Sequence, residues 1–311
     1  MKWNKKGLIS DPKSNNSDWI NHYAALPVAH LLNNEKLRIY FSTRDSKGRS
    51  VPTYLDTNPE KPKDIQYIHN KSILDFGPQG SFDDNGIMPS WILDVGDKKH
   101  LYYIGWNPQV TVSYRLSIGL AISYDGGNSF KKHSVGPILD RDKDEPFFNT
   151  APCVLKVGEE YMMWYVSCTG WKNINNWPEP FYNIKCAKSA DGINWTRFNK
   201  TCIDYDDFTQ AIGKPCVFIE NNTFKMLYSY RNAIDYRTDP NRSYRLGYAE
   251  SKNGIDWIRK DEEVGIKFSE NGWDSIMNEY CTTYVHKNLR HLIYNGNGFG
   301  EAGFGYATLD I

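Results

Sequence analysis

The chain has 311 residues, and its 37 basic and 37 acidic side chains give it a formal net charge of zero. This balance argues against binding to nucleic acid or to an anionic membrane surface, since proteins of both kinds carry an excess or a patch of basic residues. No apolar run approaches the roughly 18 residues that a membrane span needs, and residues 1–12 contain lysines but no apolar signal segment. We therefore expect a cytoplasmic protein without a membrane span.

Aromatic residues are frequent, with 10 Trp, 21 Tyr and 14 Phe making up 14% of the chain. Together with 24 Gly and 15 Pro, they predict many strands and tight turns and argue against long helices. The six cysteines contain no CxxC pair, so we expect no metal site. Buried, reduced thiols are favoured over the disulfides of an exported protein. The cysteines are Cys153, Cys168, Cys186, Cys202, Cys216 and Cys281.

One repeated phrase consists of a proline, an apolar run, a polar turn and an aromatic-rich run, as in residues 151–171, APCVLKVGEEYMMWYVSCTGW. The proline, which is replaced by a cysteine in the fifth and most degenerate copy, recurs at intervals of 62, 63, 63 and 66 residues. Five copies fill the chain, and a repeat of this period indicates a modular architecture. The marker residues are Pro27, Pro89, Pro152, Pro215 and Cys281.

A second phrase combines an apolar strand, a turn that contains glycine and a following aromatic residue, at residues 118–130, 184–195 and 246–257. Each copy predicts a β-hairpin, because glycine supplies the positive φ that such a tight turn requires. We assign these hairpins a structural role. Each unit of the chain then consists of two hairpins, which makes four antiparallel strands.

Four antiparallel strands repeated at a constant interval indicate a β-propeller, in which blades are arranged radially and leave only short edges. We predict an all-β fold, with residues 1–311 forming a single five-bladed β-propeller domain of four-stranded antiparallel blades. Residues 1–9 resemble the last strand of a unit, and residues 303–310 resemble a third strand. The N-terminal strand is therefore expected to close the ring.

The start of the first strand and the end of the second strand of each unit are expected to meet at one face, around the axis. The side chains at these places suit a sugar, because hydroxyl groups need donors and acceptors while an aromatic ring stacks on the apolar face of a pyranose. Two acids there could serve glycoside hydrolysis. The candidate catalytic residues are Asp84, Glu145 and Glu279. The candidate binding residues are His22, Tyr23, Arg44, Asp45, Trp106, Asn149, Trp171, Lys214, Arg231 and Asn295.

A structural reading of the same residues stays open. Polar groups at exposed strand ends can simply be solvated. Arg44 and Asp45 can form an ion pair, and Trp106 can pack between blades. The convergence of the whole set, and no single member of it, points to function.

The proline-led first strand, the aromatic second strand and the SxDGxxW-like hairpin resemble the five-bladed propeller glycoside hydrolases. That group includes arabinanase-like, invertase-like and mannoside-phosphorylase-like families, and the chain looks most like a bacterial branch of it. The resemblance implies an acid just before the marker of a late repeat, where this chain has Glu279, and it makes Asp84 the nearest partner. The aspartate that arabinanase-like enzymes place in the first blade is missing, since residues 21–27 read NHYAALP.

We expect a carbohydrate-active enzyme that cleaves or transfers a glycosyl unit at the axial mouth, using Glu279 and a second acid from Asp84 or Glu145. Phosphorolysis would fit the missing aspartate, because it needs only one essential acid. The alternative is a non-catalytic propeller that binds a glycan or a protein. We expect no cofactor and no nucleic-acid partner, and the sequence leaves the oligomeric state open.

Three cations near the mouth favour an anionic ligand, such as a phosphorylated, nucleotide-linked or acidic sugar. They are Arg44, Lys214 and Arg231.

Overall fold

The computed structural model describes residues 1–13, 19–20, 22–207 and 209–311, so Asn21 of the segment 21–27 lies outside the described residues. Twenty β-strands and two short 3-10 helices, η1 (Pro240–Arg242) and η2 (Asp261–Glu263), form within these ranges. Neither helix is long and apolar enough to cross a membrane. The predicted all-β class is confirmed.

In the first two sheets, strands that follow one another along the chain pair antiparallel. Two four-stranded sheets come first. One contains β2 (Ala25–Asn33), β3 (Lys36–Arg44), β4 (Ser50–Thr57) and β5 (Ile65–Ile68). The other contains β6 (Ile87–Val95), β7 (Lys98–Pro108), β8 (Tyr114–Ser123) and β9 (Lys131–Lys132).

The next two four-strand units share one larger sheet, because a single parallel pair between Tyr182 and Ala211 joins them. The first unit contains β10 (Asn149–Val157), β11 (Glu160–Ile174), β12 (Trp177–Ser189) and β13 (Thr196–Ile203). The second contains β14 (Ala211–Glu220), β15 (Thr223–Arg231), β16 (Arg245–Ser251) and β17 (Trp257–Arg259).

The two ends of the chain meet in one sheet. It contains β18 (Glu279–His286), β19 (Leu289–Asn295), β20 (Phe304–Asp310) and the N-terminal β1 (Asn4–Ser10). Strand β1 pairs antiparallel with β20, from Asn4 opposite Thr308 to Ser10 opposite Phe304. The predicted pairing of the N-terminal strand with residues 303–310 is confirmed.

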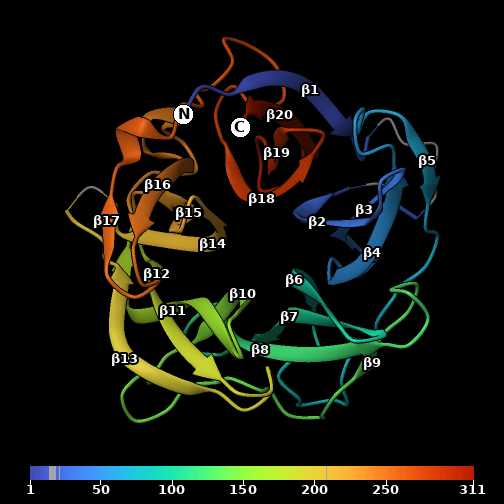
Figure 1. Ribbon diagram of the computed structural model, residues 1–311. Helices are drawn as coiled ribbons and strands as arrows, with labels where there is room; N and C mark the ends of the chain where they lie inside the picture. The colour runs from blue at the N-terminus through green and yellow to red at the C-terminus, as the bar shows by residue number, and fades with distance from the viewer. Residues whose placement is uncertain (14–18, 21, 208) are drawn as a thin grey trace.

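The first strands of the units face a common centre, around which the sheets are arranged in Figure 1. Strand β2 contacts β6, β6 contacts β10, β10 contacts β14, β14 contacts β18, and β18 contacts β2. The contacts between neighbouring units therefore return to their starting point.

The glycine-containing hairpins tie one unit to the next. In each, a serine hydroxyl accepts a hydrogen bond from a glycine N–H of the turn, as between Ser189 and Gly192 at 2.9 Å. The carbonyl oxygen of that glycine accepts a bond from an aromatic side chain of the preceding unit, here the hydroxyl of Tyr102 at 2.9 Å. Equivalent bonds join Tyr40 to Gly127 and Trp164 to Gly254. The hairpins are thus structural, as the sequence suggested.

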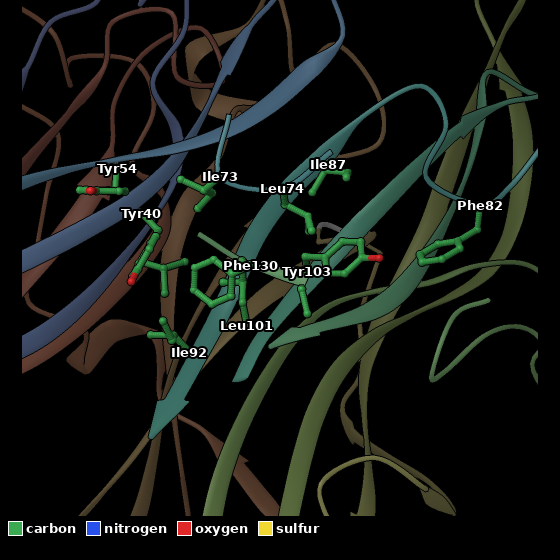
Figure 2. Close-up of a cluster of buried hydrophobic side chains, with 12 residues drawn as sticks. Tyr40, Tyr54, Ile73, Leu74, Phe82, Ile87, Ile92, Leu101, Tyr103 and Phe130 are labelled. Atoms are coloured by element: carbon green, nitrogen blue, oxygen red, sulfur yellow. The ribbon is translucent and has the colours of Figure 1, made fainter. Parts of the chain in front are cut away.

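The core lies between neighbouring sheets. Between the first two, Tyr40 of β3 packs edge-on against Phe130, which precedes β9, with ring centroids 5.8 Å apart. Leu101 of β7 belongs to the same buried cluster (Figure 2). All six cysteines are free and buried, in agreement with the prediction of buried thiols.

Candidate functional site

A backbone bulge places one residue of each first strand at the centre. The pairing between the first and second strands shifts near every marker residue. In four units the residue just before the marker proline or cysteine has a positive φ, between 48° and 53°. This backbone conformation is costly for any residue except glycine. All five residues at this position line one cavity: Leu26, Met88, Ala151, Lys214 and Tyr280.

This cavity has a volume of about 340 Å³ and receives side chains from every unit. Five of the ten binding residues predicted from the sequence line it. They are Tyr23, Arg44, Trp106, Lys214 and Arg231. The five units therefore contribute side chains to one central cavity, and its role as a binding site stays a prediction.

One wall of the cavity is aromatic. Trp106 at the end of β7 lies 4.4 Å from Tyr114 at the start of β8, measured between ring centroids. Trp171, which is not a lining residue, packs edge-on behind this wall against Tyr114 and Phe148, at 5.3 and 5.8 Å. These rings offer an apolar surface on which the face of a sugar can stack.

A buried arginine occupies another wall. The guanidinium of Arg231, at the end of β15, lies 3.6 Å from the ring centre of Tyr236 and donates to the hydroxyl of Tyr244 at 3.2 Å. The Tyr244 hydroxyl is 2.6 Å from that of Tyr182 on β12. Glu179 of β12 lies 3.5 Å from the Arg231 guanidinium and pairs more closely with Arg237, at 2.5 Å. The positive charge of Arg231 therefore has a carboxylate partner.

Two other cations of the cavity have no carboxylate partner among the described residues. Arg44 donates to the carbonyl oxygen of Gly48 at 3.2 Å and to the hydroxyl of Ser50 at 2.6 Å, and its guanidinium lies 5.1 Å from the ring centre of Tyr23. The ammonium of Lys214, a residue only 1% exposed, donates to the carbonyl oxygen of Ser90 at 3.1 Å. Among the described residues neither forms an ion pair with a carboxylate.

Glu279 is a fully buried acid at the start of β18. Its side chain is 0% exposed, and neither carboxyl oxygen has a hydrogen-bond partner among the described residues. Burial raises the pKa of Glu279 well above its usual value, against the opposing effects of Tyr280 and the Arg231 charge. The carboxyl group does not line the cavity, but its neighbours Tyr280 and Arg231 do. Glu279 is therefore a fully buried acid whose sequence neighbour Tyr280 lines the cavity and whose neutral form burial favours.

The other two predicted acids lie outside the cavity lining. Asp84 accepts hydrogen bonds from the Asn107 side chain at 2.9 Å and from the N–H of Gly80 at 2.7 Å. Glu145 accepts from the hydroxyls of Tyr165 and Ser167, both at 2.8 Å. Both carboxylates thus accept hydrogen bonds from residues of their own units.

Glu145 belongs to an arrangement that recurs in other units, in which an acid lies between a tyrosine and a cation of the outermost strand. The Glu145 carboxylate also lies 3.3 Å from the guanidinium of Arg197 on β13. In the second unit Asp83 combines a tyrosine, Tyr103, with a cation, Lys132, at 2.8 and 2.5 Å. In the last sheet Asp274 does the same with Tyr294 and Lys5, at 2.8 and 2.6 Å. The repetition of an acid between a tyrosine and an outer-strand cation favours a packing role for Glu145.

The remaining predicted residues support the frame or lie beside the cavity. Asn149 donates to Glu145 at 2.6 Å. Asn295 joins β19 to the start of β2 by accepting from the N–H of Leu26 at 2.8 Å. His22 and Asp45 line a separate hollow together with Tyr23 and Arg44. Asp45 pairs with Arg49 at 2.8 Å, so the ion pair considered between Arg44 and Asp45 does not form.

Several cavity residues were missed by the sequence analysis. Tyr182 lies on a third strand, and Tyr236, Arg237 and Tyr244 come from the segment between β15 and β16, whereas the prediction took only first-strand starts and second-strand ends. The length of that segment, residues 232–244, was a signal that could have revealed them. Among the described residues, no three His, Cys, Asp or Glu side chains gather in a way that could hold a metal ion.

Two relatives from Mycobacterium tuberculosis match the whole chain. They are the uncharacterized proteins MT1551, from strain CDC 1551 / Oshkosh, and Rv1502, from strain ATCC 25618 / H37Rv. Each is 35% identical over 311 residues, which covers 100% of both chains. The chain belongs to their family. No family model matches the sequence.

Solved glycoside hydrolases share the fold of this family. One described as a glycoside hydrolase superimposes with a TM-score of 0.76 at 16% identity, over 98% of this chain and 91% of the other. A thermostable family-43 glycoside hydrolase gives 0.68 at 15% identity, over 95% and 90%. A structure from work on mannoside phosphorylases and glycoside hydrolases of family GH130 gives 0.72 at 16% identity, over 99% and 93%. The predicted resemblance to the propeller glycoside hydrolases is thus confirmed at the level of the fold.

Proposed function

We propose that this protein is a carbohydrate-active enzyme that cleaves or transfers a glycosyl unit in the central cavity, with Glu279 as the proton donor. The observation that carries the proposal is the fully buried carboxyl group of Glu279, with its raised pKa, next in sequence to a lining residue of a cavity that all units line. The glycoside-hydrolase-like fold and the aromatic wall at Trp106 and Tyr114 support a sugar as the ligand.

The architecture we propose is a single domain over residues 1–311, a propeller of five blades closed by β1. Support comes from the cyclic contacts of β2, β6, β10, β14 and β18 and from the pairing of β1 with β20. The cytoplasmic location also stays a prediction.

In the proposed reaction the Glu279 carboxyl group donates its proton to the oxygen of the departing group as the glycosidic bond breaks. Because Tyr280 and Arg231 line the cavity and Glu279 does not, the proposed reaction requires the lining to shift when a substrate binds. An acid kept neutral by burial is suited to donate a proton near pH 7. A second acid from Asp84 or Glu145 stays a prediction, and with one acid only, transfer of the glycosyl unit to phosphate is favoured over hydrolysis.

A non-catalytic glycan-binding protein is the second candidate. The observation in its favour is that Glu279, Asp84 and Glu145 are all absent from the cavity lining. Binding would need the aromatic wall and the polar groups but no shift that exposes Glu279.

The two functions differ in their dependence on Glu279. We would screen nitrophenyl glycosides with and without inorganic phosphate and then measure the variant Glu279→Gln on any substrate found. If Glu279 is the general acid, kcat falls on the order of 10²–10⁴-fold, while the exposed control Glu159→Gln keeps the wild-type rate. An unchanged rate in Glu279→Gln would contradict the assignment. Sugar binding without turnover in the wild-type protein would support the second candidate.

A further inference from the structure

The cavity carries more positive charge than its own acids balance. Four cations line it, Arg44, Lys214, Arg231 and Arg237. Glu179 serves both Arg231 and Arg237. Burial raises the pKa of Glu279 well above its usual value, which disfavours the charged form of that carboxyl group. One carboxylate cannot balance two arginines, so the cavity keeps an excess of positive charge. Among the described residues, Arg44 and Lys214 are the lining cations that form no ion pair with a carboxylate.

Lys214 is the less usual of these two residues. It is buried to 99%, its backbone has a φ of 51°, and its ammonium uses one of three donors on the carbonyl oxygen of Ser90. A buried ammonium without a carboxylate partner is costly, and so is a positive φ for a side chain other than glycine. The positive φ belongs to the bulge that Leu26, Ala151 and Tyr280 share. The cost of the unpaired ammonium is offset if an acceptor on a ligand completes its shell of donors.

Arg44 presents an incomplete donor set as well. Among the described residues, one terminal nitrogen of its guanidinium donates both of its hydrogen bonds, to Gly48 and to Ser50. The nearby Tyr23 and Tyr280 rings line the same cavity, so the guanidinium is partly desolvated there. A planar fork with unused N–H groups is well matched to two oxygens of a carboxylate or phosphate.

We propose that Arg44 and Lys214 form an anion subsite for a carboxylate or phosphate group carried by the sugar ligand. Arg231 is not part of this subsite, because its guanidinium lies 3.5 Å from the carboxylate of Glu179 and three tyrosine rings surround it. The inference rests on the proposed function in one respect only, that the cavity binds a carbohydrate.

The test is binding, measured by calorimetry on the Glu279→Gln protein so that no turnover interferes. The probes are glucose 1-phosphate, glucuronate and neutral glucose at matched ionic strength. We expect at least one charged probe to bind at least tenfold more tightly than glucose, and its identity distinguishes a phosphate from a carboxylate. Arg44→Gln and Lys214→Met should each weaken that probe at least tenfold and leave glucose unchanged.

Two control variants sharpen the result. Arg141→Gln removes an exposed arginine outside the cavity and should change nothing. Arg231→Met should weaken charged and neutral probes alike. Failure of both charged probes to bind more tightly than glucose would overturn the proposal, and so would equal losses for charged and neutral probes in both Arg44→Gln and Lys214→Met. Because only binding is measured, the anion subsite can be confirmed even if the protein proves not to be an enzyme.

Discussion

The buried carboxyl group of Glu279 has a measurable effect on stability that needs no substrate. In the unfolded chain this group ionises near the usual 4.5 of a glutamate, while burial keeps it protonated in the folded protein to a much higher pH. Above pH 4.5 the folded state therefore binds more protons than the unfolded state, so its stability falls as the pH rises. Glu279→Gln removes this loss, because the amide does not titrate. The variant should be more stable than the wild type at neutral pH while losing activity.

The size of the effect follows from linkage. The difference in unfolding free energy between Glu279→Gln and the wild type should grow by roughly 1–2 kcal/mol for each pH unit, as long as the pH lies below the pKa of the folded state. For a chain of 311 residues this corresponds to roughly 2 °C in melting temperature per pH unit. Thermal and urea unfolding between pH 5 and 8 would measure it, with the exposed Glu159→Gln as the control. Parallel stability profiles for Glu279→Gln and wild type would refute the reasoning.

Three further predictions concern other parts of the molecule. Glu145→Gln should lower the free energy of unfolding by roughly 1–3 kcal/mol, because the neutral amide bonds more weakly than the buried carboxylate to the hydroxyls of Tyr165 and Ser167, while Arg197 keeps its ion pair with Asp142. The rate per folded molecule should not change; a selective loss of kcat would assign Glu145 to catalysis instead. Burial lowers the pKa of His291 to about 4. Between pH 6.5 and 4 the unfolded chain therefore binds a proton at this residue that the folded protein does not bind, so stability should fall as the pH drops through that range. His291→Phe should reduce that fall by on the order of 1–2 kcal/mol in urea titrations, whereas the exposed control His133→Phe should not. Trp106→Ala should weaken sugar binding about tenfold in calorimetry through loss of ring stacking, and an unchanged affinity would place the sugar elsewhere.

The repeat could be found in the sequence because its physical causes are local. Turns that need glycine and strands that begin near a proline recur in the sequence at a nearly constant spacing. This spacing predicts the observed strand pairs, including that of β1 with β20. The intervals between markers vary by only a few residues, since each unit has to bury the same faces against its neighbours.

The site was only partly predictable, because strand position alone does not tell where a side chain points. Glu145 and Asn149 sit at a first-strand start, as expected, but their polar groups bond to each other and to β11 and β13. Tyr236 and Tyr244 reach the cavity from a connection that has no counterpart of similar length in the first three units. Such a contribution depends on the path of one loop in space, and no periodic pattern records it.

Comparison of the units with one another separates the frame from the site. Two kinds of packing contact use the same chemistry in different units. In one, an acid bonds to a tyrosine and pairs with a cation; in the other, an aromatic side chain donates to the carbonyl oxygen of a hairpin glycine. At the residue before the marker the backbone bulge recurs, but the side chains differ in size, charge and polarity, being Leu26, Met88, Ala151, Lys214 and Tyr280. Four of these residues hold a positive φ that glycine would accept without strain. If the cavity binds a ligand as proposed, these five different side chains would give it an asymmetric lining, with an apolar residue in three units, a cation in the fourth and a phenol in the fifth.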